Sequence, residues 1–155
     1  MKFANIKWLV VMLLAPLFTA CDWQDLPAYS EAEISAVQFE YRWEGSRKDP
    51  ITGEAIVESV QLNVSSDVDS DNAVVNATVR VPAANTTFTE SVRNSVSQSK
   101  LWVKATVSTA ARVTPMEGTN PMGTPDDWTK DHKFNVMAAD GSSKVWTIRI
   151  VQFSK

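Results

Sequence analysis

The feature that most constrains this fold is a strict alternation of apolar and polar side chains that begins near residue 34 and recurs almost to the end of the chain. In the first stretch the apolar positions are Val37, Phe39, Tyr41 and Trp43, with polar residues between them. Successive side chains of a β-strand point to opposite faces, so a period of two places these residues on one buried face. The pattern after residue 33 predicts strands and no helix.

Further strands are predicted in the same way at residues 60–64, 73–81, 101–107, 111–114, 134–138 and 146–150. Loops and turns are expected at residues 45–54, 65–72, 83–99 and 116–131, and of these 83–99 is expected to be the least ordered. Asp140-Gly141-Ser142-Ser143 is a hairpin signal, because glycine tolerates the positive φ at which the chain reverses. About seven antiparallel strands with one wet face predict an all-β, immunoglobulin-like sandwich of two sheets.

The first 21 residues have the layout of a bacterial export signal. Lys2 and Lys7 make the start basic, residues 8–18 are apolar and uncharged, and small residues lead to Cys21. The apolar run is too short for a membrane-spanning helix, which needs about 20 residues. The segment resembles a bacterial lipoprotein signal, in which the leader is removed and the cysteine becomes the acylated first residue.

Phe18 departs from that pattern, which prefers Leu, Val or Ile three residues before the cysteine. Phe18 also disfavours ordinary signal cleavage after Ala20, because the peptidase that removes ordinary signal peptides needs a small residue at position 18. An ordinary signal peptide with an incidental cysteine stays the alternative. We expect a signal peptide at residues 1–20, a lipid-anchored tether at 21–32, and the sandwich at 33–155, exposed on the bacterial outer membrane.

The charge balance and the cysteine count exclude several classes of protein. The chain has 15 basic and 18 acidic residues, and Lys2 and Lys7 lie in the leader, so the mature chain has 13 against 18, a net charge of −5. This balance gives no reason to expect nucleic acid as a partner. A single cysteine cannot form an internal disulfide, so its position before the tether calls for lipidation instead.

Three pieces of the sequence, in order, carry a family likeness: Val79–Pro82, Ala111–Pro115 followed by Gly118, and Lys133–Ile150. Together they resemble the immunoglobulin-like domains of Bacteroidetes surface lipoproteins of unknown function, whose last hairpin reads much like V-T-A-x-D-G-S-T-K-x-W-T-V-x-V. The likeness covers most of residues 34–151. It implies an outer-surface protein, often encoded beside systems that capture and import polysaccharides, and it transfers no binding residues.

The sequence offers little for catalysis. The single histidine, His132, lies in a charged approach to a strand, and we expect a solvated loop residue with no nucleophile motif to serve. Zinc sites need several His or Cys ligands, which the chain lacks. Asp126 and Asp127 could act as a carboxylate pair on a glycosidic bond only across a cleft that a small sandwich hardly provides. We therefore expect a protein that is not an enzyme.

Acidic residues at alternate positions, Asp67, Asp69 and Asp71 followed by Asn72, could wrap a calcium ion. An EF-hand loop would need glycine where Asn72 stands and glutamate where Thr78 stands, and both are missing. A polar turn is the better interpretation, with a low-affinity calcium site as the alternative. We expect no other cofactor.

Aromatic rings are natural platforms for the apolar faces of sugars. Trp43 and Trp146 fall on the inward period and belong to the predicted core. Trp102 falls on the polar face of its strand and Trp128 lies in the long loop, so these two are the candidate ligand-binding residues. In the alternative, Trp128 folds back as a lid on the core and Trp102 meets a loop.

Three hypotheses of function follow. In the first, the protein is a non-catalytic surface module that binds a glycan or assists a polysaccharide-capture and uptake complex. In the second, it is an adhesion or assembly subunit whose sheet edges pair with a strand of a protein partner. An enzyme is the third and has the least support.

The lipoprotein interpretation makes one direct prediction. Mass spectrometry of the protein purified from membranes is expected to show Cys21 as an acylated first residue, since two or three acyl chains would hold the protein on a membrane. An unmodified Cys21 would overturn the interpretation.

Overall fold

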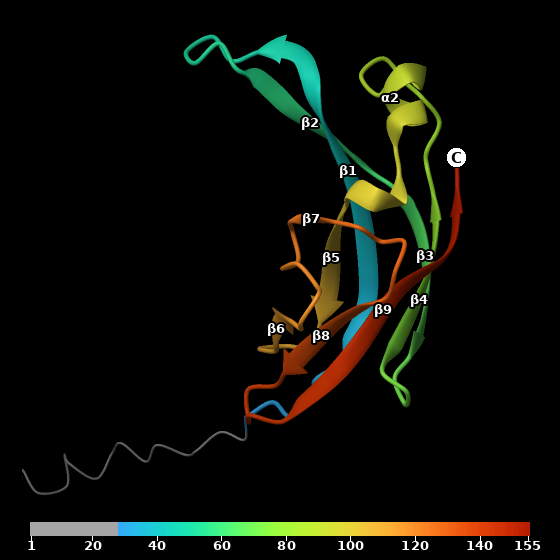
Figure 1. Cartoon of the computed structure of the whole chain (residues 1–155). Helices are drawn as coiled ribbons and strands as arrows, with labels where there is room; N and C mark the ends of the chain where they lie inside the picture. Colours follow the sequence, from blue (N-terminus) through green and yellow to red (C-terminus); the bar gives the residue numbers. More distant parts are fainter. Residues whose placement is uncertain (1–27) are drawn as a thin grey trace, which may run out of the picture.

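The computed structural model describes residues 28–155, which form a sandwich of two β-sheets (Figure 1). Sheet A has the order β2-β1-β5-β7 and contains β1 (Ile34–Lys48), β2 (Ala55–Gln61), β5 (Leu101–Val107) and β7 (Pro125–Asp126). Sheet B has the order β3-β4-β9-β8-β6 and contains β3 (Asn63–Asp69), β4 (Val74–Arg80), β6 (Arg112–Pro115), β8 (His132–Met137) and β9 (Ser143–Ser154). The predicted all-β sandwich is confirmed.

Neighbouring strands run antiparallel except at one place. β4 and β9 are parallel, with Val74 opposite Thr147 and Val75 opposite Ile148. A parallel pair needs a long crossover connection, and here the chain between the two strands passes through sheet A and back. The expectation of purely antiparallel strands is therefore wrong for this pair.

The core between the sheets is built from the inward positions of the alternating strands. Phe39, Val103, Phe134 and Trp146 are all almost completely buried. The indole Nε1 of Trp146 donates a hydrogen bond of 2.9 Å to the carbonyl oxygen of Ala32, so the largest core side chain of β9 is also satisfied. A period of two is thus enough to identify most of the core.

The chain changes sheets at Leu62, which lies between β2 and β3. The side chain of Leu62 is buried and its N–H donates to the carbonyl oxygen of Phe39 at 2.9 Å. The sequence predicts one strand over residues 60–64, which the structure divides at Leu62, and an acidic turn over 65–72, of which only residues 70–72 form a turn. The alternation continues through a corner, and strand β3 runs on to Asp69 before the chain turns.

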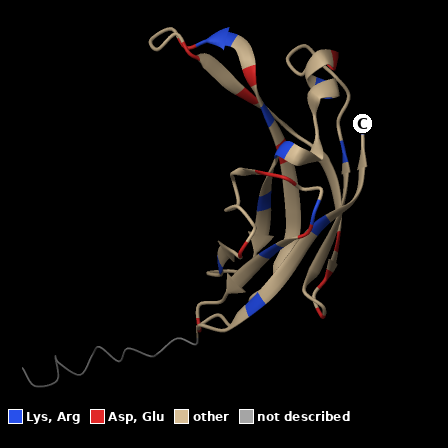
Figure 2. Cartoon of the chain, in the orientation of Figure 1, with Lys and Arg blue, Asp and Glu red and all other residues tan. Residues whose placement is uncertain are grey.

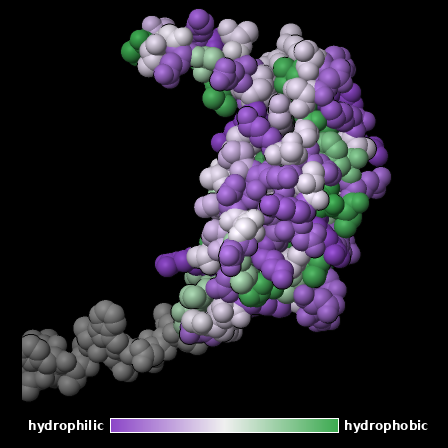
Figure 3. All heavy atoms as spheres, in the orientation of Figure 1, coloured by the Kyte–Doolittle hydropathy of each residue, from purple (hydrophilic) through white to green (hydrophobic). Residues whose placement is uncertain are grey.

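The first strand is longer than its alternation suggests. β1 continues to Lys48, where the sequence predicts a loop from residue 45. Its first part pairs with β5 and its last part pairs with β2, and the registers show Glu40 paired with both neighbours. Residues 41–61 therefore leave the sandwich as a two-stranded arm, which stands clear of the body in Figures 1 and 3.

Residues 83–99 are ordered, contrary to expectation. They contain a short helix, α2 (Glu90–Ser95), and a 3-10 turn, η2 (Gln98–Lys100). Phe88 and Val96 are buried on either side of α2 and fix the segment to the core. Two isolated apolar residues in a polar stretch have no period, so the alternation could not reveal them.

The described chain begins against the terminal hairpin of β8 and β9. The carbonyl oxygens of Tyr29, Ser30 and Ala32 accept hydrogen bonds from Asp140, Ser142 and Trp146. The predicted tether runs to residue 32, but its last residues pack on the body. The hairpin itself turns at Gly141, whose φ of 89° agrees with the turn signal read from the sequence.

Comparing substitutions at two buried tryptophans tests how much the hydrogen bond from Trp146 to Ala32 contributes to stability. Trp146→Phe removes the donor to the Ala32 carbonyl, whereas Trp128→Phe removes an Nε1 that has no partner in the described structure. We expect Trp146→Phe to lower the free energy of unfolding by about 1–2 kcal/mol more than Trp128→Phe in urea denaturation. Equal losses would contradict the assigned role of the bond.

Candidate functional site

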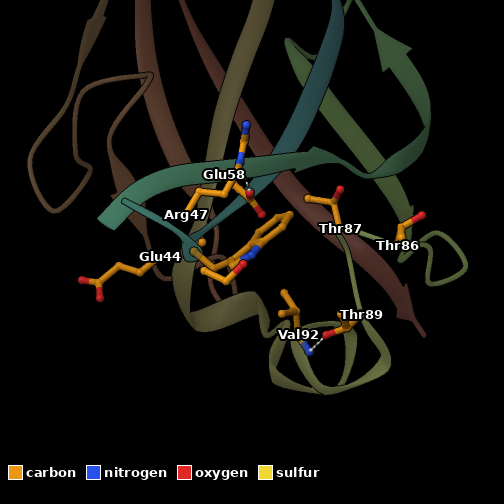
Figure 4. A pocket seen from close by; sticks show the side chains of 10 residues that line it. Glu44, Arg47, Glu58, Thr86, Thr87, Thr89 and Val92 are labelled. Atoms are coloured by element: carbon orange, nitrogen blue, oxygen red, sulfur yellow. Dashed lines mark hydrogen bonds and ion pairs between the residues drawn. The ribbon is translucent and has the colours of Figure 1, made fainter. Parts of the chain in front are cut away.

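A cleft of about 450 Å³ opens between the arm and the segment that leads into α2 (Figure 4). The arm contributes residues 43–47 and Glu58, and the opposite wall contributes Thr86, Thr87, Thr89 and Val92. We call this hollow the arm cleft. It exists because β1 and β2 continue beyond the sandwich while α2 stands beside them.

Trp43 gives the arm cleft an aromatic wall that is held firmly from behind. Its ring stacks on Tyr41 at 6.3 Å with an interplanar angle of 15°, and it lies 5.5 Å from the ring of Phe88. Trp43 is only partly buried, so the predicted core position is at the rim of the core. A fixed, half-exposed indole is well suited to contact a flat apolar surface.

Glu58 lies opposite Trp43 across the β1–β2 ladder and shares its face of the arm. Its side chain is only 11% exposed, and its Oε1 lies 3.4 Å from Nε of Arg47, which is itself 71% exposed. In Figure 4, Glu58 lies among the labelled side chains, whereas Glu44 extends away from them. The arm cleft therefore holds one nearly buried carboxylate.

Gly45 makes room for that carboxylate. A Cβ atom at this position would lie 2.7 Å from Cδ, 2.8 Å from Cγ and 2.9 Å from Oε1 of Glu58. Carbon atoms do not approach so closely, so any other residue at position 45 would displace the Glu58 side chain. Glycine is needed here for close approach and not for a special backbone conformation.

Local turn chemistry shapes the opposite wall. The side-chain oxygen of Asn85 accepts hydrogen bonds from the N–H groups of Thr87 and Phe88 at 2.9 and 2.8 Å. Thr89 is the N-cap of α2, and its hydroxyl accepts from Val92 N–H at 3.4 Å. These contacts place Thr86 and Thr87 on the surface at the edge of the arm cleft.

Trp102, one of the two candidate residues, lies on the outer face of sheet A, as its place in the alternation predicts. It borders a second hollow of about 310 Å³ beside Lys100, Pro125 and Val57. The guanidinium carbon of Arg42 lies 5.4 Å from the centre of the Trp102 ring. Arg42 therefore covers part of the ring that a sugar would otherwise contact.

Glu40 holds this outer face together. Its carboxylate pairs with Arg42 and accepts a hydrogen bond of 2.7 Å from Nζ of Lys104. Burial favours a higher pKa for Glu40, but the hydrogen bonds and charges of Lys104 and Arg42 outweigh it and lower the pKa below the ordinary value of 4.5. The carboxylate is thus ionised and fixes Arg42 over Trp102.

Trp128, the other candidate, is a core residue. Only 1% of it is exposed, and its ring meets Phe39 edge-on at 4.8 Å. The loop that carries Trp128 folds back over the core, which was the alternative interpretation of the sequence. Trp128 is thereby removed from the candidate binding surface.

The expectation of a solvated loop histidine at position 132 is wrong. His132 is the first residue of β8 and is completely buried, with its ring 4.3 Å from that of Trp128. Its Nε2 donates to the carbonyl oxygen of Asp127 at 2.8 Å, and its Nδ1 lies 3.4 Å from a carboxylate oxygen of Asp126. A histidine enclosed in this way cannot meet a substrate from solution.

Asp126 and Asp127 stabilise the same loop. Asp126 accepts from the N–H groups of Asn120 and Asp127, each at 2.8 Å. The hydroxyl and the N–H of Thr129 both donate to Asp127 and lower its pKa below the usual range. Asp127, with its lowered pKa, lacks the raised pKa that a general acid for glycosidic cleavage needs.

The structure does not assemble the alternative calcium site. Asp67 lies within β3, and both carboxylate oxygens of Asp69 accept hydrogen bonds from Asn72, at 3.0 and 2.7 Å. Within residues 28–155 no three His, Cys, Asp or Glu side chains gather closely enough to hold a metal ion. Asp67, Asp69 and Asp71 therefore belong to a strand and its polar turn.

Cys21 and the predicted signal peptide lie outside the described residues. Across the part of the chain that the structure describes, no helix is long and apolar enough to span a membrane.

Figure 2 shows acidic and basic residues interspersed on the described strands, with no single basic stripe in this view.

The geometry defines a two-sheet domain with a lateral arm and a polar–aromatic cleft, and the comparisons place it in a family. Residues 34–149 match the model of the DUF5018-related family, so the chain belongs to that family, whose function is unknown. The predicted kinship with Bacteroidetes domains of unknown function is confirmed at that level.

One solved relative comes from Bacteroides fragilis NCTC 9343 and was described as a "putative secreted protein". It is 47% identical to this chain, the match covers 83% of this chain and 100% of that one, and the TM-score is 0.76. No curated protein matches this chain significantly.

Sequence reasoning missed the arm cleft. The alternation predicts a core position for Trp43, and no pattern in the sequence indicates a binding role for Glu58, Gly45 or Thr87. One signal was present: Trp43 ends a run of inward aromatic residues just before Gly45, where the sandwich itself ends. A strand that continues beyond its partner exposes its last inward side chain.

The Glu40 pair should give a measurable dependence of stability on pH. Because the folded-state pKa of Glu40 is lowered, its contribution is complete above about pH 4.5 and is lost as the pH falls through the folded value. We expect Glu40→Gln to be destabilising by on the order of 1 kcal/mol at pH 7, with a smaller difference at pH 3. A difference that grows on acidification, measured by urea denaturation, would contradict this assignment.

Proposed function

We propose that this protein is a non-catalytic cell-surface module that binds a glycan in the arm cleft. The observation that carries the proposal is that one hollow contains a partly exposed indole and a nearly buried carboxylate. The indole belongs to Trp43, and the carboxylate belongs to Glu58, which lies beside Arg47. Indoles contact the apolar faces of sugar rings, and carboxylates and guanidinium groups bind sugar hydroxyls. A cleft of about 450 Å³ has the size of a small-ligand site.

The position of the arm agrees with a surface module. Residues 29–32 pack against the terminal hairpin, whereas the arm stands at the opposite end of the molecule in Figure 1. In this proposal acylated Cys21 anchors the chain to the outer membrane and the arm cleft points away from the lipid. Such a module would assist a complex that captures and takes up polysaccharide.

Three of the four sheet edges, those of β3, β6 and β7, give little support to a partner strand, and the seven-residue β2 is the fourth edge. β6 is four residues long and ends at Pro115, and β7 has two residues. β3, at the other edge of sheet B, carries Asp67 and Asp69. Short edges, proline and charge are the usual means by which proteins prevent strand addition.

The proposal predicts glycan binding that depends on Trp43. A soluble chain from residue 22, which contains all described residues, is tested by affinity electrophoresis against a polysaccharide panel and then by calorimetry on the best ligand. Trp43→Leu keeps an apolar side chain against Phe88 but removes the ring, and we expect at least a tenfold loss of affinity.

Trp102→Leu is the matched control, because Trp102 borders the second hollow together with Trp43 but does not line the arm cleft, and Arg42 covers part of its ring. This variant should bind within about twofold of the natural protein. Failure of every glycan to retard the protein would refute the proposal, and equal losses in both variants would remove the site from the arm cleft.

A further inference from the structure

We propose that the arm cleft selects uncharged sugar rings and rejects acidic ones, and that Glu58, seated against Gly45, sets this selectivity. This inference rests on the proposed function, because it names the class of glycan that the same cleft would take.

The charges that line the arm cleft favour neutral ligands. Its charged side chains are Glu44, Arg47 and Glu58, and the opposite wall is made of threonines and a valine. Arg47, the one cation among the lining residues, already faces the carboxylate of Glu58. A uronate or sulfate in the cleft would approach Glu58, and the one cation near it, Arg47, already lies 3.4 Å from that carboxylate.

Glu58 cannot easily turn away from such a ligand. With 11% of its side chain exposed, it lies against the backbone at Gly45, where even a methyl group would come within 2.7 Å. An ionised carboxylate only accepts hydrogen bonds, so it suits neighbouring hydroxyl groups, which donate. The same group repels a second carboxylate.

The position of Glu58 would have a second effect on binding. Trp43 and Glu58 are cross-strand partners, with Trp43 paired to Glu58 in the β1–β2 register. A ring that lies on the indole would thus present its hydroxyl edge to the carboxylate. Stacking supplies affinity for any ring, whereas Glu58 distinguishes rings by the charge and hydroxyls on that edge.

The experiment compares one neutral glycan that binds with the same glycan oxidised at C6 to the uronate. The natural chain from residue 22 should bind the oxidised form at least tenfold more weakly, and added salt should narrow this gap because salt screens charge repulsion. Glu58→Gln keeps the shape of the side chain, and should reduce the neutral-to-acidic ratio at least tenfold.

Gly45→Ala tests whether the close approach of Glu58 to Gly45 is needed for binding. The variant leaves every other cleft side chain in place but pushes Glu58 aside, and the clash involves the outer atoms of one side chain and no backbone atom, so the fold should persist. We expect a three- to tenfold loss of neutral-glycan affinity with an unchanged thermal midpoint. Ser59→Ala, on the opposite face of the same strand, is the control and should bind normally.

The outcomes separate the two proposals. If neither form of any glycan binds, the proposed function fails and the selectivity fails with it. If the oxidised form binds as tightly as the neutral form and Trp43→Leu abolishes both, the cleft binds glycans but the selectivity is wrong. If Glu58→Gln leaves the ratio unchanged, or Gly45→Ala binds normally, Glu58 is not the selecting group.

Discussion

The structure depends on the way in which β1 divides its hydrogen bonds between two neighbours. Its first part pairs with β5 inside the sandwich, and its last part pairs with β2 outside it. Glu40 stands where the two registers meet. Beyond Glu40 the backbone of β1 has no partner in β5, and β2 supplies hydrogen bonds to this part of β1 along its other edge. The arm, the arm cleft and the corner at Leu62 all follow from this division.

Most of the fold was accessible from the sequence, because one physical rule decides it. Where a strand has one wet face, the period of two identifies both the strand and the inward residues, as with Phe39 and Trp146. The rule gives no information where a strand passes from one sheet to the other or where a segment has no alternation. It cannot see that the alternation through Leu62 crosses between sheets, and it cannot detect Phe88, which anchors an otherwise polar segment.

The candidate site was less accessible, because alternation gives the face of a side chain and not its surroundings. Trp102 lies on the outer face as predicted, but Arg42 covers part of its ring. Trp128 is in a loop as predicted, but that loop closes over the core. Trp43 was assigned inward correctly, yet its strand leaves the sandwich and carries the ring to the rim. Long-range contacts decide these three cases.

The attachment of residues 29–32 to the terminal hairpin has a mechanical consequence. A pull on the chain ahead of residue 29 would first load the three hydrogen bonds that join Tyr29, Ser30 and Ala32 to the hairpin. Strand β1 begins only two residues after Ala32, so these bonds stand between an external load and the strand that carries the arm. Such a load would therefore reach the hairpin of β8 and β9 before it reached β1 and the arm.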